Sequence, residues 1–243
     1  MGNKSHFFRQ SSGGGGLFPL QLTPVVYINA SQGVNLDSFG RVDTVDDLSG
    51  NGYNFSGVNS PELEINGINN LPSIRLNGSN YLSNEDTLTE ISDLSQRFIW
   101  CVFKITDANS GTSYHNIFIN DTTSYNSVGN NYIHFYNSNN SNSFYNGYAG
   151  NVPFDSTISE TQLTPKFVII DKTLTQVEYT LNGVSNTNTY NLGYTASNKN
   201  IYLGSWNSRN AKMLLSEYGI LNYTPTPQQI QDLKDYFQNT YNI

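Results

Sequence analysis

The feature that most constrains this chain is an alternation of short apolar runs and polar turns, which begins at Val25 and continues almost to the end. The turns are rich in Asn, Gly and Ser, which favour tight turns, and the runs are rich in β-branched and aromatic residues, which favour strands. The spacing leaves no room for the crossover helices that parallel strands need. The pattern therefore predicts an all-β fold, a two-sheet antiparallel sandwich.

Individual strands can be placed from these runs. Arg97–Ile105 (RFIWCVFKI) is apolar on both faces, so we expect a central strand of the sandwich. Asn77-Gly78, inside Ser73–Leu82, is the dipeptide most typical of a two-residue hairpin and predicts one here. A further hairpin is expected from Lys166–Asp171 and Thr175–Val184. The remaining strands are expected at 25–29, 115–120, 131–137, 201–206 and 212–223.

The last residues carry a helix pattern. Thr226 is a suitable N-cap, Pro227 suits the first helical position, and Gln229 completes a capping box. Apolar residues then recur at helical spacing, at Ile230, Leu233, Tyr236 and Phe237. A helix this short is marginal alone, so we expect it, over about 226–239, to pack on the sandwich.

The first residues differ from the rest. Residues 1–16 end in four glycines and form a flexible N-terminal arm with a Gly tether, and residues 17–243 form the sandwich domain. The arm carries the candidate partner-binding residues His6, Phe7, Phe8, Arg9 and Gln10. In one interpretation this segment is a docking peptide whose two Phe side chains are anchors. In the other it is a disordered terminus or a vector-derived remnant.

Composition excludes several partners. The net charge is −7 and charged residues make up 13%, which argues against a nucleic-acid surface. The start of the chain has no apolar signal region, and no run approaches the about 18 apolar residues of a membrane span. Cys101 is the single cysteine, so we expect a buried thiol and no intrachain disulfide. We expect a soluble protein made in a cytoplasm.

Several segments together resemble a known family, the LamG-like, concanavalin A-like lectin-glucanase jelly roll. The matching segments, in the family's order, are Asp46–Phe55 (DDLSGNGYNF), Ser73–Leu82 (SIRLNGSNYL), Phe98–Ile105, Glu178–Val184 (EYTLNGV) and Leu214–Tyr241. The likeness covers about 25–243. It implies the sandwich fold with a packed C-terminal helix, in the version found in bacterial surface proteins, glycan-active enzymes and phage structural proteins. The fold hosts many functions, so it does not select one.

The resemblance raises glycoside hydrolysis, which needs two placed carboxylates. The E-x-D-x-x-E strand of related glucanases is absent. Glu62 and Glu64 share a strand face without a third acid. The acids of another segment have the wrong spacing; they are Glu85, Asp86 and Glu90. Glu217 matches the family's strand Glu, and we interpret it as a structural residue that bonds across the sheet or to a loop. We therefore predict no enzyme and no catalytic residue.

Metal sites are not predicted. The histidines, His6, His115 and His134, are scattered and lack the spacing of a zinc site. Members of the resembled family often bind calcium at a loop rim. Asp46, Asp47 and Asn51 supply oxygen donors, but turn capping explains them as well. We expect no cofactor, with calcium left open.

Carbohydrate binding has candidate residues. Sugars stack on aromatic faces, and amides and hydroxyls bond their hydroxyl groups. The candidate set is Trp206, Tyr132, Tyr145 and Asn207. An aromatic and Asn-rich β surface is also simply the composition of a viral or surface jelly roll, so both interpretations stay open.

The sequence leads to two functional hypotheses. The first is a non-enzymatic structural or decoration protein of a phage virion, on capsid or tail, anchored to other virion proteins by its N-terminal arm. Whether it forms a homo-oligomer in the assembly is left open by the sequence. The second is a lectin-like module that recognises host surface glycans. The arm, the absence of a signal peptide and of disulfides, and the Asn/Tyr/Gly-rich composition favour the first.

Overall fold

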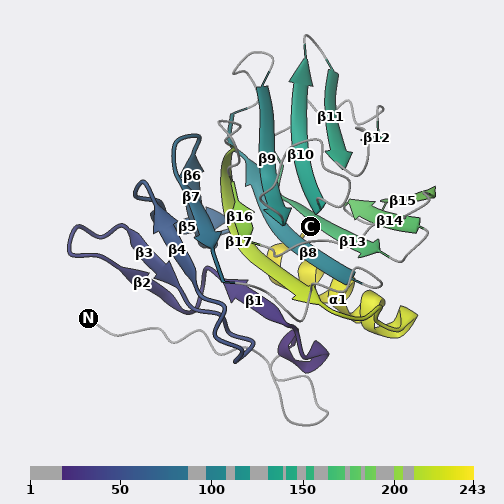
Figure 1. Cartoon of the computed structure of the whole chain (residues 1–243), viewed down its shortest axis with the longest axis horizontal. Helices are drawn as coiled ribbons and strands as arrows, with labels where there is room; N and C mark the ends of the chain where they lie inside the picture. The colour runs from purple at the N-terminus through teal and green to yellow at the C-terminus, as the bar shows by residue number, and fades with distance from the viewer. Residues whose placement is uncertain are drawn as a thin grey trace.

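The computed structural model describes residues 18–86, 97–107, 113–120, 131–138, 141–146, 152–155, 164–172, 176–181, 184–189, 200–204 and 211–243. Within these residues the chain forms two antiparallel sheets and one C-terminal helix (Figure 1). The predicted sandwich with a packed C-terminal helix is therefore confirmed. The predicted arm lies outside the described residues. No helix in the described part is long and apolar enough to cross a membrane.

The first sheet, sheet A, has the order β15-β14-β13-β8-β17-β6-β5, and β1 also pairs with β17. Its strands are β1 (Val26–Asn29), β5 (Glu62–Ile68), β6 (Leu71–Asn77), β8 (Arg97–Ile105), β13 (Lys166–Lys172), β14 (Gln176–Leu181), β15 (Val184–Thr189) and β17 (Lys212–Leu221). A short 3-10 helix, Leu20–Leu22, precedes β1.

The second sheet, sheet B, has the order β12-β11-β10-β9-β16-β7-β4-β3-β2. Its strands are β2 (Val34–Leu36), β3 (Val42–Val45), β4 (Phe55–Val58), β7 (Tyr81–Asn84), β9 (Ser113–Asn120), β10 (Asn131–Ser138), β11 (Ser141–Asn146), β12 (Val152–Asp155) and β16 (Ile201–Leu203).

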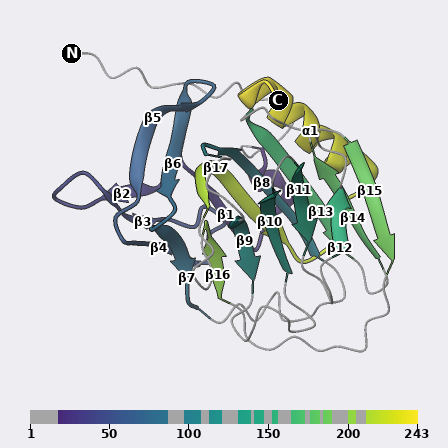
Figure 2. The ribbon, with the colours of Figure 1, turned by 90° about the horizontal axis from the view of Figure 1, so that it is seen from above.

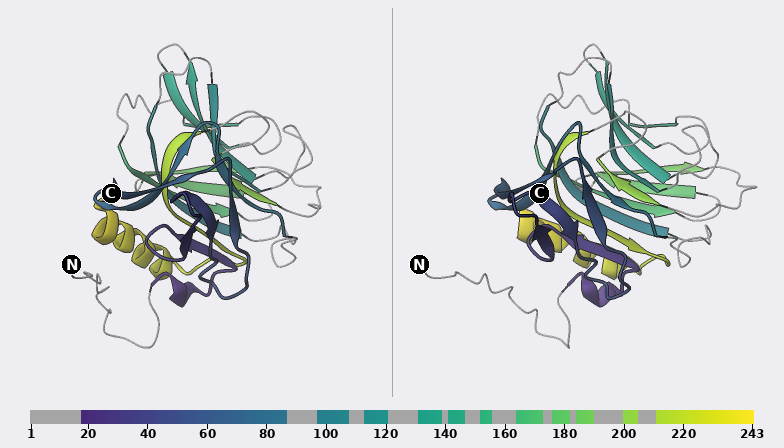
Figure 3. Two further views of the ribbon diagram at one scale, coloured as in Figure 1. Left: turned by 90° about the vertical axis from the view of Figure 1, so that its left-hand side faces the viewer. Right: turned by 60° about the vertical axis from the view of Figure 1, so that its left-hand side comes forward.

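Sheet A is the middle layer of the molecule. Figure 3 shows helix α1 (Pro227–Tyr241) on one side of it and strands β9–β11 of sheet B on the other. Alternate residues of β8 therefore enter different cores: Ile99, Cys101 and Phe103 pack between the sheets, and Phe98, Trp100 and Val102 pack on the helix side. This confirms the predicted central strand and the buried cysteine.

Helix α1 begins as predicted. Thr226 is the N-cap, Pro227 opens the helix, and Thr226 and Gln229 form both hydrogen bonds of the capping box. The helix ends two residues later than predicted, at Tyr241. Asn242 adopts a left-handed conformation, and its N–H bonds the carbonyl of Gln238. The longer helix adds Tyr241, which is buried, to the predicted apolar stripe.

The hairpin predicted at Asn77-Gly78 is wrong. The two strands it joins lie in different sheets, since β6 pairs with β5 and β17, whereas β7 pairs with β4 and β16. In place of the backbone hydrogen bonds of a hairpin, the buried side chain of Asn80 forms two bonds. Its Oδ1 accepts from Asn77 N at 2.7 Å, and its Nδ2 donates to Ser60 O at 3.1 Å. Ser60 lies in the β4–β5 connection, so one side chain joins two corners at which the chain changes sheets.

The second predicted hairpin is confirmed. β13 and β14 pair in antiparallel register, with Ile170 opposite Tyr179. β14 continues into a further hairpin with β15, in which Leu181 lies opposite Val184. Only Asn182-Gly183 separates these two residues, so the same dipeptide joins paired strands here and crosses between the sheets at Asn77-Gly78.

The role of Asn80 can be tested by substitution. We expect Asn80→Ala to lower the free energy of unfolding by about 1–3 kcal/mol, because it leaves the Asn77 amide and the Ser60 carbonyl without this partner. Urea unfolding at neutral pH measures the change. Ser79→Ala in the same turn is the control, since this exposed residue should change stability by less than about 0.5 kcal/mol. Equal effects would contradict the bridging role.

Candidate functional site

The outer face of sheet B is the candidate ligand-binding surface. Leu82, Ile201 and Leu203 point into the core between the sheets. Successive side chains of a strand alternate between faces, so Tyr81 and Tyr202 point outward. Both are partly exposed, and their ring centroids lie 6.0 Å apart at a tilt of 58°. No described helix covers this face, whereas α1 covers the outer face of sheet A.

One row of directly opposed residues crosses this face. It consists of Asn35 (β2), Thr44 (β3), Ser56 (β4), Ser83 (β7), Tyr202 (β16), Ile119 (β9) and Tyr132 (β10). Strands in a sheet lie about 4.8 Å apart, so the six steps of the row span about 29 Å. Opposed residues of antiparallel strands occupy the same face. The row thus combines hydroxyl and amide groups at its β2 end with Tyr202 farther along.

The polar end of the row is held by its own contacts. Asn35 Nδ2 donates to Thr44 Oγ1 at 3.1 Å and to Asp46 Oδ1 at 2.9 Å. Near the other end, Asn200 Nδ2 donates to the Tyr202 hydroxyl at 3.4 Å. The face therefore offers both aromatic rings and fixed hydrogen-bonding groups.

Two of the predicted carbohydrate residues belong to strands of this sheet. Tyr132 is a member of the row, and Tyr145 of β11 lies opposite His134 of β10, two positions along from Tyr132. Trp206 and Asn207 lie outside the described residues, as do all the arm residues, His6 to Gln10. The register thus brings Tyr132 near Tyr202, which sequence reasoning did not select. The signal for Tyr202 was its alternation between Ile201 and Leu203.

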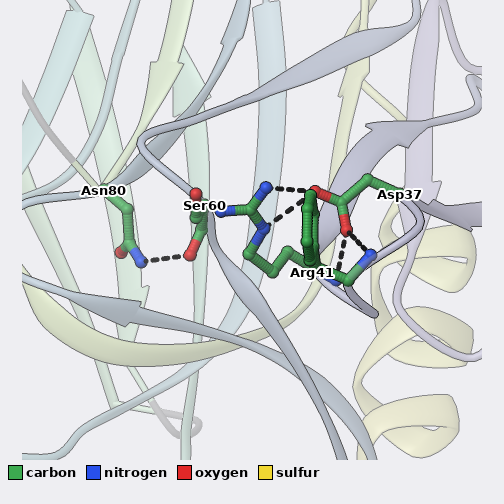
Figure 4. Close-up of polar contacts among 5 residues, drawn as sticks. Asp37, Arg41, Ser60 and Asn80 are labelled. Atoms are coloured by element: carbon green, nitrogen blue, oxygen red, sulfur yellow. Dashed lines mark hydrogen bonds and ion pairs between the residues drawn. The ribbon is translucent and has the colours of Figure 1, made fainter.

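A second exposed feature is the tip of the β2–β3 hairpin, which projects away from helix α1 (Figure 2). Phe39 at this tip is 80% exposed, and the guanidinium carbon of Arg41 lies 4.8 Å from its ring centroid. Figure 4 shows Arg41 between Asp37 and the Ser60 corner. Sequence reasoning missed this tip. Its signal was an aromatic residue inside a short Asp-x-x-Gly turn between two strands.

The candidate calcium residues hold a loop together. Asp47 Oδ1 accepts from the backbone N–H groups of Tyr27 and Ser49, and its Oδ2 accepts from Tyr53 N. Asn51 uses its amide nitrogen to donate to Val25 O. These contacts confirm the turn-capping interpretation. In the ranges that the structure describes, no group of three or more His, Cys, Asp or Glu side chains is placed to hold a metal.

Glu217 is a buried structural residue, as interpreted from the sequence. A β-bulge in β17 places Leu215 opposite Phe103 but Glu217 opposite Val102. Ser216 is the extra residue. Before the bulge, Met213 and Leu215 face the core between the sheets, and after it Tyr218 and Ile220 do. The bulge thereby turns Glu217 toward the helix side.

The Glu217 carboxylate accepts hydrogen bonds from three elements. Trp100 Nε1 of β8 donates to Oε1 at 3.0 Å. Oε2 accepts from Asn29 Nδ2 of β1 at 3.3 Å, and from the hydroxyls of Tyr236 at 2.9 Å and Tyr241 at 2.8 Å on α1. Burial raises the pKa of Glu217 to about 7, because desolvation outweighs the hydrogen bonds that lower it. These bonds attach the helix to sheet A.

Two other carboxylates are also held in place, those of Glu64, which was considered for hydrolysis, and of Asp171. Glu64 forms an ion pair with Arg75. Asp171 of β13 lies opposite Glu178 of β14, on the helix-side face of sheet A. Burial raises the pKa of Asp171, and a hydrogen bond from Thr224 Oγ1 at 3.0 Å lowers it, with a smaller upward effect of the Glu178 charge. The Thr224 bond ties this pair to the segment leading into α1.

Comparison with known proteins identifies the fold. No protein-family model and no curated protein sequence matches the chain. Domain 4 of AbnA, an extracellular GH43 arabinanase from Geobacillus stearothermophilus solved with arabinotriose, aligns with a TM-score of 0.62 and 16% identity over 87% of this chain and 98% of that one. The chain therefore has the β-sandwich fold of that domain.

Two further structures share the fold. The binding domain of botulinum neurotoxin DC, solved with SialylT, has a TM-score of 0.63 and 16% identity over 91% of this chain and 53% of that one. Trypanosoma rangeli sialidase, solved with 2,3-difluorosialic acid, aligns with a TM-score of 0.62 and 13% identity. The alignment covers 90% of this chain and 33% of the sialidase. The chain thus spans about half of the neurotoxin domain. The predicted lectin-like sandwich is confirmed at the level of the fold, and nothing in these matches concerns phage particles.

The Glu217 site makes stability depend on pH. The folded pKa of about 7 lies above the usual value of 4.5, so the folded state holds the proton more tightly than the unfolded state. This contribution to stability is present below about pH 4.5 and is lost as pH rises to about 7, by up to about 1.4 kcal/mol per pH unit. Glu217→Gln cannot titrate, so we expect it to lose less stability over this range than the wild type.

Urea unfolding at several pH values between 5 and 8 measures this difference. Glu64→Gln is the matched control, because Glu64 is partly exposed and should leave the slope near that of the wild type. Parallel pH curves for the wild type and Glu217→Gln would show that Glu217 does not titrate in this range.

Proposed function

We propose that this chain is a non-enzymatic, lectin-like module that binds carbohydrate on the outer face of sheet B. The observation that carries the proposal is the row from Asn35 to Tyr202, with the Tyr81 ring beside that of Tyr202. The fold neighbours support it, since AbnA domain 4 was solved with arabinotriose and the neurotoxin binding domain with SialylT.

The chemistry of this face suits sugars. A tyrosine ring offers a flat apolar surface for the C–H face of a sugar ring, and its hydroxyl can donate or accept. Serine, threonine and asparagine side chains can bond sugar hydroxyls. Thr44, Ser56 and Asn35 provide such groups in one line. The row therefore suits an elongated ligand better than a single sugar.

The placement of the acidic residues supports a binding role over a hydrolytic one. Glu217 is fully buried under helix α1, and Glu64 is paired with Arg75. Asp171 is held by Thr224 on the opposite sheet from the tyrosine face. A glycosidase needs two carboxyl groups on either side of the bond it cleaves. None of these three groups lies on the face proposed to bind sugar, and Asp46, beside the row, accepts a hydrogen bond from Asn35.

Tyr202 provides the test of the proposal. We expect Tyr202→Ala to weaken binding of a glycan by about tenfold, because it removes a stacking ring, and Tyr202→Phe to keep most of the affinity. A glycan array with the full chain identifies the ligand, and isothermal titration calorimetry measures the affinities. Thermal unfolding of each variant checks that the fold is intact.

Two results would contradict the proposal. The first is an absence of binding by the full chain across neutral and acidic glycans at millimolar concentration. The second is equal affinity of Tyr202→Ala and the wild type, which would move the site away from this face.

The virion role remains a second, finer proposal. A decoration protein of a phage capsid or tail would present the sandwich at the particle surface and attach through His6 to Gln10. The arm sequence is what supports it, since two adjacent Phe residues precede a glycine tether. Weak sugar contacts repeated over many copies would add up on a cell surface, so the two roles are compatible.

The arm can be tested separately from the sandwich. We expect a pull-down from the native source lysate to recover a capsid or tail protein with the full chain, but not after deletion of residues 1–16. The double variant Phe7→Ala/Phe8→Ala should also fail to recover the capsid or tail protein, because these rings are the proposed anchors. The double variant Ser11→Ala/Ser12→Ala should still recover it. Mass spectrometry identifies the recovered proteins. Equal recovery by all forms would show that the arm is not needed for the interaction.

A further inference from the structure

The tip of the β2–β3 hairpin carries the most exposed large apolar side chain in the described part of the chain. Phe39 is 80% exposed, and Leu36 on the same hairpin is 48% exposed. Exposed single apolar residues are common on proteins and by themselves need no explanation. Phe39 differs because the residues around it hold the tip in one conformation.

Asp37 organises this conformation. Its Oδ1 accepts from Phe39 N at 2.8 Å and from Arg41 N at 3.0 Å, and its Oδ2 accepts from Arg41 Nε at 2.8 Å. The chain then turns through Gly40, whose φ of +78° favours glycine. Gly40 N bonds the Asp37 carbonyl at 3.0 Å. The tip is thus ordered before any ligand arrives, which lowers the entropic cost of binding.

Arg41 occupies one side of the Phe39 ring. Its guanidinium carbon lies 4.8 Å from the ring centroid, at a distance typical of a cation–π contact. Because the residue is still 80% exposed, the remaining face of the ring is open to solvent. A flat ring that is supported from one side and open on the other is a stacking platform.

The charges around the ring indicate the class of ligand. Arg41 is already paired with Asp37, with Arg41 Nη2 2.6 Å from Asp37 Oδ2. Glu62 of β5 forms an isolated β-bridge with Arg41 and is exposed. The single cation is therefore already paired with a carboxylate, Glu62 is a further acidic residue on the neighbouring strand, and the whole chain has a net charge of −7. Such a tip repels an anionic ligand and suits a neutral one.

The tip continues the surface already described. Asn35, the first residue of the row on sheet B, precedes Phe39 by four residues on the same hairpin. At about 3.4 Å per residue, the tip lies within about 14 Å of the end of the row. The tip lies along β2, at right angles to the row, so a ligand that contacts Asn35 must extend along this strand to reach Phe39.

We propose that Phe39 is a second sugar-stacking site, which binds a ring of a neutral glycan whose other units contact the face of sheet B. This inference rests on the proposed function, because it takes carbohydrate as the ligand. It adds a contact residue outside the sheet face, and it excludes sialylated and uronic-acid glycans as the preferred class.

Three variants test this role. We expect Phe39→Ala to lower the affinity for the best neutral oligosaccharide by about tenfold, and Phe39→Trp to retain or raise it, because a larger ring stacks at least as well. Ile65→Ala is the matched control, since Ile65 is an exposed apolar residue, 60% exposed, on a different strand. It should bind as the wild type does. Both positions are exposed, so thermal unfolding of the three variants should be unchanged.

The probes are a series of neutral linear oligosaccharides that includes arabinotriose, and a sialylated trisaccharide as the acidic counterpart. Calorimetry with the full chain measures each affinity. Unchanged binding by Phe39→Ala, while Tyr202→Ala loses affinity, would overturn the role of Phe39 and leave the proposed function standing. Preference for the sialylated probe would overturn the neutral class. If the wild type binds no glycan, both the inference and the proposed function fail.

Discussion

The structure depends on the burial of sheet A from both sides. A strand in a middle layer has no solvent face, so every residue of β17 must find a buried partner, and nearly all of them are buried. Burial of an acidic side chain in such a strand ordinarily lowers the stability of the fold. The bulge at Ser216 resolves this, because it directs Glu217 to the side where Trp100 and two tyrosines can donate hydrogen bonds. Gly219 then leaves room for the Trp100 ring, since a Cβ there would lie 2.0 Å from Trp100 Cζ2.

The covered face of sheet A also explains where a ligand can bind. Helix α1 and its apolar stripe occupy that face, so the sandwich has one broad sheet surface left among the described elements, on sheet B. Strands β4, β3 and β2 continue this surface to the edge of the sheet, and the tip of the β2–β3 hairpin carries an aromatic ring supported by Arg41. The two proposed sugar contacts thus follow from one asymmetry, a helix on one sheet and none described on the other.

Features set by neighbouring residues could be predicted from the sequence, and features set by distant ones could not. The helix start at Thr226 depends on Gln229, three residues away, and it was predicted to the residue. Asn77-Gly78 has the local signature of a hairpin, but the Asn80 bond to Ser60, twenty residues away, decides its path. The Asp-x-x-Gly pattern around Phe39 marks a turn, but the exposure of the ring follows from the position of β2 at the sheet edge, which this pattern does not reveal. The structural interpretation of Glu217 held because the family resemblance supplied its context.

Strand β17 has one further consequence, for the order in which the chain can fold. It pairs with β8 on one side and with both β6 and β1 on the other, and Asn29 meets Glu217 across 188 positions of sequence. During synthesis β1 leaves the ribosome well before its partner strand, because 188 positions separate Asn29 from Glu217. Sheet A cannot close until both strands are made, so β1 stays without this partner while the residues between them are translated. Contacts this distant in sequence form slowly, and the protein must stay soluble through that interval.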